Sequence, residues 1–90
     1  MTEQEAEQLS VTLMRVVSLL NQTAAFVKDK DSKENWHIYR QAVGKAMGEI
    51  CIELEDPLWR RFPKLEPEAL GGSYKVNPKI YEPKFYESAE

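Results

Sequence analysis

Glu34 and His37 have the spacing of a metal-binding motif. A carboxylate and an imidazole three positions apart share one face of a helix, as in di-iron helical bundles. Such a site also needs inward carboxylates from the companion helix, where the sequence offers Asp29 alone. The pair falls in the first turn of its predicted helix, where a glutamate commonly caps the helix end. We expect a capping glutamate, a surface or interface histidine, and no metal ion or cofactor.

Cys51 is the single cysteine and the one candidate nucleophile with unusual surroundings. Its sequence neighbours on the predicted helix are apolar, which raises the pKa of a thiol and keeps it unreactive. The only histidine, His37, lies roughly 21 Å away along the helix axis at 1.5 Å per residue. No cysteine–histidine dyad forms within one chain at that distance, and no phosphate loop or serine elbow is present. We predict a non-enzymatic protein.

Four carboxylates crowd the predicted end of the second helix, where the helix dipole disfavours negative charge. They are Glu49, Glu53, Glu55 and Asp56. A cation site or an acid/base pair is one interpretation of this cluster. We favour a solvated acidic face, partly neutralised by the basic residues that follow it in the chain.

Those basic residues are Arg60, Arg61 and Lys64, interleaved with Trp59 and Phe62. Aromatic rings between cations are typical of surfaces that stack nucleic-acid bases and contact phosphates. The cluster holds few charges, and the 90-residue chain has a formal net charge of -3. Nucleic-acid binding needs a basic surface, so this balance argues against it.

The first helix is predicted from Glu3 to Lys28. Thr2 and Glu5 have the spacing of a capping box at its start. Apolar residues then recur at three- and four-residue steps, which places them on one stripe of a helix. They are Ala6, Leu9, Leu13, Val16, Val17, Leu20, Ala24 and Val27.

A second helix follows a short charged connection and begins with either Asp31 and Glu34 or Ser32 and Asn35 as its cap. Its apolar face comprises Trp36, Tyr39, Val43, Met47, Ile50 and Leu54. The residue before a proline disfavours helical geometry, so we expect this helix to end near Asp56, before Pro57. The fold class is therefore all-α, with an antiparallel two-helix hairpin.

Short proline-opened turns complete a hairpin domain over residues 1–72. One turn is expected after Asp56 and stops before Pro63, and another runs from Pro67 to a glycine stop at Gly71. Residues 73–90 form an extended Pro/Tyr-rich tail, because proline recurs there at a spacing that suits neither helix nor strand. We expect some of its aromatic side chains to rest on the hairpin or on a partner.

The first helix is apolar over most of its circumference, which is typical of an interior helix. One antiparallel neighbour covers only about a third of a helix surface. Either the tail folds back over this helix, or two hairpins pair into a dimeric four-helix bundle, or both occur. We favour the dimer, because the tail is short and rich in proline, whereas self-association buries the whole length of the helix.

Two glycines four residues apart in the second helix, Gly44 and Gly48, favour the close approach of another backbone over chance tolerance. The predicted interface combines them with the flanks of the first helix and the aromatic turn after Pro57. It comprises Val11, Met14, Leu19, Ala25, Phe26, Gly44, Gly48, Trp59 and Phe62.

The N-terminal residues are acidic and carry no Lys or Arg before Arg15, the reverse of a secretory or transit leader. The least charged stretch, residues 8–27, is long enough to span a bilayer but contains Arg15 and a polar run. We expect a cytoplasmic protein without a membrane partner.

The second helix and its exit resemble a pattern in small helical bacterial proteins of about this length, a group without an established activity. The pattern is Tyr39-Arg40-x-x-Val43-Gly44-x-x-Met47-Gly48, then Asp56-Pro57-Leu58-Trp59-x-x-Phe62-Pro63-x-Leu65-x-Pro67. The resemblance implies a small helical bacterial protein and assigns no functional residue.

The sequence thus favours a homodimeric interaction or regulatory module, which binds itself and presents the Trp59–Phe62 turn or the tail to another protein. Two alternatives remain open. One is a metal- or small-ligand-binding bundle that uses Glu34, His37 and the acidic helix end. The other is an accessory nucleic-acid-binding protein.

Overall fold

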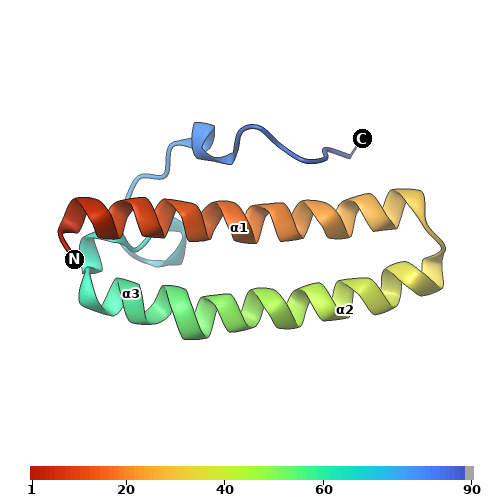
Figure 1. Ribbon diagram of the computed structural model, residues 1–90, viewed down its shortest axis with the longest axis horizontal. Coiled ribbons are helices and arrows are strands. Elements are labelled where there is room, and N and C mark those ends of the chain that lie inside the picture. The colour runs from red at the N-terminus through yellow and green to blue at the C-terminus, as the bar shows by residue number, and fades with distance from the viewer. Residues whose placement is uncertain (89–90) are drawn as a thin grey trace.

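The computed structural model describes residues 1–88 and shows an all-α chain built on two long antiparallel helices (Figure 1). Short helical turns and a tail follow this hairpin, as predicted. Residues 1–88 contain no strand, and an isolated parallel bridge joins Pro67 to Tyr74. The last two positions of the predicted tail, residues 89–90, lie outside the described residues.

Helix α1 (Glu3–Lys30) begins at the predicted capping box. The backbone N–H of Thr2 donates to Glu5 Oε1 at 2.7 Å, and the backbone N–H of Glu5 donates to Thr2 Oγ1 at 3.1 Å. These bonds satisfy two backbone donors that a helix start would leave open. The helix ends at Lys30 instead of Lys28, because its last turn continues until the N–H of Asp31 donates to the carbonyl of Val27.

Helix α2 (Lys33–Ile50) starts directly after a tight connection formed by Asp31 and Ser32. Of the two caps considered, the Ser32 cap forms, since the N–H of Asn35 donates to Ser32 Oγ at 3.1 Å. Asp31 Oδ1 instead accepts from the Asn35 side chain at 3.0 Å and from the Ser32 N–H at 2.6 Å. Both hydrogen bonds lower the pKa of the Asp31 carboxyl, and the bond from the Asn35 side chain has the larger effect.

The short proline-opened helix predicted after Asp56 is present, but the expected end of the second helix before it is not a break in the helical chain. Helix α2 passes into a π-helical turn, η1 (Cys51–Glu55), and then into α3 (Asp56–Arg61). The N–H of Asp56 donates to the carbonyl of Cys51, five residues earlier, so this turn is wider than an α-helical turn. Proline lacks an N–H, and its ring crowds the preceding turn of a regular helix. After the π-turn, Pro57 lies in the first turn of α3, a position where proline is tolerated.

The same π-turn changes which side chains face α1. Leu54, expected on the buried face of the second helix, is 50% exposed, whereas Glu55 is only 6% exposed. One extra residue in a turn rotates all later side chains by about 100° relative to regular helical spacing. Glu55, Leu58 and Trp59 consequently take the inward side.

The proline-opened turns after α3 follow the prediction. Helix α3 stops before Pro63, where the short 3₁₀ turn η2 (Pro63–Leu65) begins. A second 3₁₀ turn, η3 (Glu68–Leu70), follows Pro67 and ends at Gly71, whose φ of 97° lies in the left-handed region that glycine adopts at low cost.

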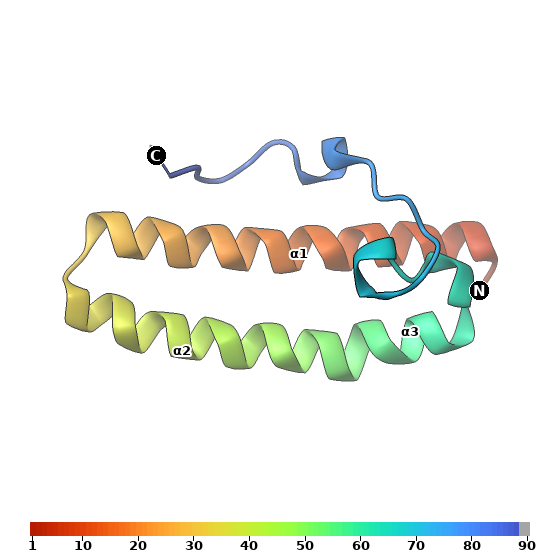
Figure 2. The same ribbon diagram turned by 180° about the vertical axis from the view of Figure 1, so that it is seen from behind.

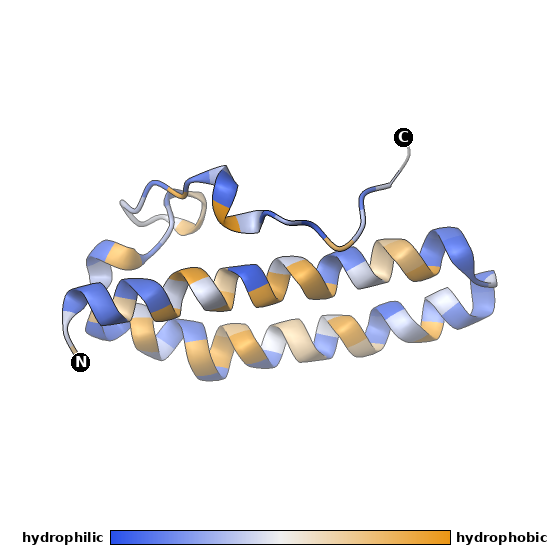
Figure 3. Cartoon of the chain, turned by 45° about the horizontal axis from the view of Figure 1, so that its top comes forward, coloured by the Kyte–Doolittle hydropathy of each residue, from blue (hydrophilic) through white to orange (hydrophobic). Residues whose placement is uncertain are grey.

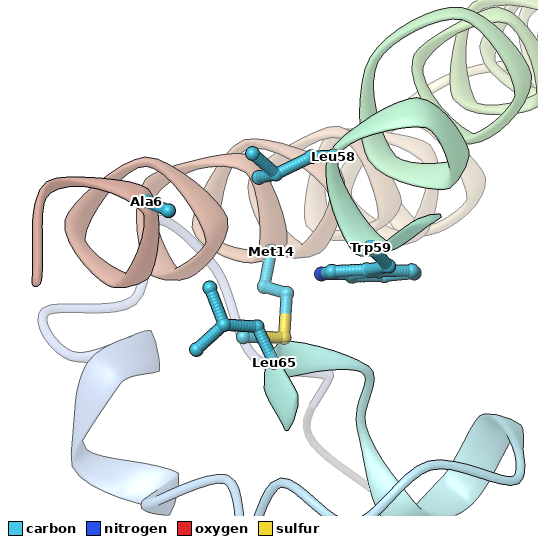
Figure 4. Packing of buried hydrophobic residues seen from close by; sticks show 5 residues of the cluster. All are labelled: Ala6, Met14, Leu58, Trp59 and Leu65. Carbon is cyan, nitrogen blue, oxygen red and sulfur yellow. The ribbon is translucent and has the colours of Figure 1, made fainter. Parts of the chain in front are cut away.

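The core lies where α3 and η2 pack against the first half of α1. Figure 4 shows Met14 of α1 beside the ring of Trp59 and the side chain of Leu65. Ser10, which is 1% exposed, accepts a hydrogen bond at 2.9 Å from Nε1–H of Trp59. That bond satisfies the one polar atom of the buried indole. The buried apolar residues of this cluster are Ala6, Met14, Leu58, Trp59 and Leu65.

The tail returns along α1 on the side away from α2 (Figure 2). It contains a 3₁₀ turn, η4 (Pro78–Tyr81), that contacts α1. Its aromatic residues rest on the hairpin, which is one of the two expected outcomes. Tyr74 Oη donates to Glu7 at 2.7 Å, and the Phe26 ring lies 5.2 Å, centroid to centroid, from the rings of both Phe85 and Tyr86.

Candidate functional site

Glu34 and His37 lie in the exposed first turn of α2. The described residues contain no group of three or more His, Cys, Asp or Glu side chains that could hold a metal ion. His37 instead lies beside Trp36, with ring centroids 6.5 Å apart. The structure therefore brings no further ligand from residues 1–88 to this pair.

Cys51 opens the π-turn and is half-buried. Burial raises the pKa of its thiol, and the negative charges of Asp56 and Glu55 raise it further. The Sγ atom lies 4.0 Å from Asp56 Oδ1, an acceptor that also favours the protonated form. This thiol has the environment of a structural cysteine and not of a nucleophile.

The basic cluster and its aromatic neighbours do not share one surface. Arg60, Arg61 and Lys64 are exposed, but Trp59 is only 5% exposed. Phe62 is half-buried against the core, with the Arg61 guanidinium 5.4 Å from its ring centroid. The indole is thus enclosed by this chain's own core and is not open for stacking on a nucleic-acid base or for presentation to another protein.

The tail occupies much of the α1 surface that the sequence assigns to a dimer. Met14 is in the core, Val11 packs against it, and Ala25 is half-buried. Phe26 contacts two rings of the tail but is still 37% exposed, and Leu19 is 38% exposed. The chain itself therefore covers part of these two flanks of α1.

Two polar side chains of α1, Gln22 and Asp29, fix the tail on this helix. Gln22 Oε1 accepts from the backbone N–H groups of Phe85 at 2.6 Å and of Tyr86 at 3.1 Å. Asp29 Oδ2 accepts from Tyr86 Oη at 2.6 Å and from Ser88 Oγ at 3.1 Å. The hydrogen bonds from Tyr86 and Ser88 lower the pKa of Asp29, and the bond from Tyr86 has the larger effect. A glutamine and an aspartate on an otherwise apolar helix are the signal that could have found this contact.

The glycine stripe approaches no other part of the described chain. Gly44 is exposed and Gly48 is half-buried. A Cβ atom added to either residue would meet no atom within 4 Å, apart from its own helix backbone. Any close approach at this stripe would have to come from another molecule.

One side of the hairpin keeps an apolar surface that neither the tail nor the turns cover; we call it the open stripe. On α1 it follows helical spacing through Leu9 and Val16, which are 40% and 38% exposed. On α2 the open stripe includes Tyr39, which is 37% exposed. It continues into the π-turn with Leu54, which is 50% exposed. Figure 3 shows hydrophobic residues, interspersed with hydrophilic ones, along both helices between their hydrophilic ends. The remaining, half-buried members are Leu20, Val27 and Ile50.

A cleft of about 380 Å³ lies on the other side of the hairpin, where α1, the π-turn, α3 and the tail meet. Glu55 lines it, and we call it the Glu55 cleft. The other lining residues are Met14, Val17, Trp59, Pro67, Ala69, Leu70, Val76, Pro78 and Tyr81. The sequence predicts Glu55 in a solvated acidic face, because the π-turn that rotates it inward has no signature in helical spacing.

By length and composition, α1 is also apolar enough to cross a membrane, a test that core helices of soluble proteins pass as well. No family model, curated protein or solved structure matches the chain, so the open stripe and the Glu55 cleft are the features from which its function must be inferred.

Proposed function

We propose that this chain is a non-enzymatic, cytoplasmic interaction module that pairs with a second copy of itself through the open stripe. The observation that supports this proposal most strongly is the row of apolar residues from Leu9 to Val27 on α1, in which Leu9 and Val16 stay 40% and 38% exposed while the others are half-buried. The row extends roughly 27 Å along the helix at 1.5 Å per residue.

A second copy fits this surface better than a charged or flat partner. Between Gln8 and Val27, α1 carries a single charged side chain, Arg15, which points away from the stripe by helical spacing. On α1 the stripe residues Leu9, Val16, Leu20 and Val27 are separated by seven, four and seven positions, a spacing compatible with the seam of a four-helix bundle. An uncharged face is complementary to its own copy in a two-fold arrangement. The proposed assembly is the four-helix bundle that the sequence suggests, formed by a different face.

The mass in solution tests this proposal. We expect light scattering after gel filtration to give twice 10.4 kDa for the wild-type chain. Val16→Glu should shift the protein to monomer, because it places a charge at the centre of the apolar seam.

Asn21→Glu is the matched control. It adds the same charge to the same helix at an exposed position roughly 140° around α1 from Val16, and it should stay dimeric. A wild-type monomer at high concentration, or equal dissociation of both variants, would contradict pairing through the open stripe.

The glycine stripe provides a separate prediction. Since a Cβ atom at either position would have only its own helix backbone within 4 Å, Gly44→Ala and Gly48→Ala should each stabilise the protein by about 0.5–1 kcal/mol through helix propensity. Urea unfolding monitored by circular dichroism measures this gain. Loss of the dimer in either variant would instead locate the interface at the glycines, as the sequence predicts.

A further inference from the structure

The Glu55 cleft combines an apolar wall with one carboxylate. Its volume of about 380 Å³ lies in the range of small-molecule pockets, roughly 300–1,000 Å³. Four parts of the chain form it: α1, the π-turn, α3 and the segment from Pro67 to Tyr81. A site assembled from segments so distant in sequence is a product of the complete fold, unlike an exposed helix end.

Glu55 has no partner that explains its burial. The side chain is 6% exposed, and no hydrogen bond or ion pair joins its carboxylate to any of residues 1–88. No Lys, Arg or His lines the cleft. Desolvation raises the pKa of Glu55, and the adjacent charge of Asp56 raises it further. A carboxylate in this position is costly, because burial removes most of its water and no group of residues 1–88 replaces it.

The Glu55 carboxylate is nevertheless within reach of a ligand. Within residues 1–88, no fully enclosed side-chain oxygen or nitrogen lacks a hydrogen-bond partner. The unpaired Glu55 oxygens therefore keep some exposure, and Glu55 lines the cleft.

The missing partner must be a cation with an apolar body. An ammonium group supplies the charge-assisted hydrogen bonds that Glu55 lacks, and its apolar substituent matches the remaining wall. Trp59 and Tyr81 also line the cleft, and aromatic rings attract cations. A neutral polar ligand could donate a hydrogen bond to the carboxylate but would leave its charge uncompensated, and an anionic ligand would be repelled by it.

We propose that the Glu55 cleft binds an organic ammonium ion, held by Glu55 at the charge and by Met14, Trp59 and Tyr81 along the apolar body. The site is independent of self-association. Met14 and Val16 lie roughly 160° apart around α1, so the cleft and the open stripe face different sides.

The first test compares probes of equal shape on the wild-type chain. Phenethylammonium should perturb the NMR signals of Glu55, Trp59 and Tyr81, and it should bind at least about tenfold more tightly than neutral 2-phenylethanol. Equal affinities, or no binding of the ammonium probe, would overturn the proposal. This comparison does not depend on any variant folding.

The second test uses variants. Glu55→Gln keeps the shape of the side chain and should weaken phenethylammonium binding about tenfold. Glu53→Gln is the matched control, since it removes an exposed carboxylate from the same turn and should bind as the wild type does. Equal losses in both variants would show nonspecific attraction and reject the site.

A third comparison distinguishes a free amine from a lysine side chain of another protein. A short peptide with one lysine flanked by alanines carries the same ammonium group on a longer body. We expect phenethylammonium to bind more tightly, because Val76, Pro78 and Tyr81 of this chain's own tail line the cleft and leave less room for a peptide. Tighter binding of the peptide would overturn the small-molecule assignment.

Discussion

Trp59→Ala should lower the free energy of unfolding by about 3–5 kcal/mol, the range for truncating a large core aromatic residue. The indole is 5% exposed and fills the space between Leu58, Met14 and the turn that carries Leu65. Its removal leaves a cavity and strips Ser10, 1% exposed, of its hydrogen-bond donor. For a domain of this size the expected fall in Tm is about 12 °C or more, measured by circular dichroism.

Trp36→Ala provides the control for that loss. Trp36 is half-buried at the start of α2, where Lys28 and Arg40 lie 5.6 and 4.9 Å from its ring centroid. Cation–π contacts at such sites contribute about 0.5–1 kcal/mol each. A Trp36→Ala loss as large as that of Trp59→Ala would contradict the assignment of the core to the α1–α3 junction.

Gly72→Ala should be the second most damaging change, by roughly 2–4 kcal/mol. A Cβ atom at this position would overlap the carbonyl group of Glu66, which belongs to the backbone and cannot rotate away. That carbonyl accepts from the N–H of Tyr74 at 2.9 Å, and the N–H of Gly72 donates to the Pro67 carbonyl at 3.0 Å. Relief of the overlap therefore breaks hydrogen bonds that hold the turn together.

Gly71→Ala is the comparison for Gly72→Ala in urea unfolding. Its φ of 97° imposes a left-handed conformation, which costs a non-glycine residue about 1–2 kcal/mol, but no atom lies within 4 Å of its Cβ position. If Gly72→Ala cost no more than Gly71→Ala, the close approach of Gly72 to Glu66 would be refuted.

Local signals in the sequence predict local structure well. The capping box of Thr2 and Glu5, the Ser32 cap and the glycine stop at Gly71 each depend on residues within a few positions of one another. Such patterns carry their own physical cause, because the side chain and the backbone group that it satisfies are neighbours in the chain. The two-helix hairpin follows from the same kind of spacing.

Contacts between distant residues are not predictable in the same way. The Trp59–Ser10 hydrogen bond joins residues 49 positions apart, and the Gln22–Phe85 bond joins residues 63 apart. Neither pair has a local signature, so the sequence predicts Trp59 at a surface and leaves open what covers α1. In the structure the tail covers part of α1. Whether a second subunit covers the open stripe stays a prediction.

The π-turn at Cys51–Glu55 contains one residue more than an α-helical turn, and we connect this added residue with the proline that follows at Pro57. A π-turn is an α-helical turn with one residue added, so deletion of one residue there would leave α2 and α3 facing the same sides as before. The proline would then lie inside a regular α-helix, which costs about 3 kcal/mol or more. Among chains descended from a common ancestor, the added residue and the proline should therefore be gained or lost together.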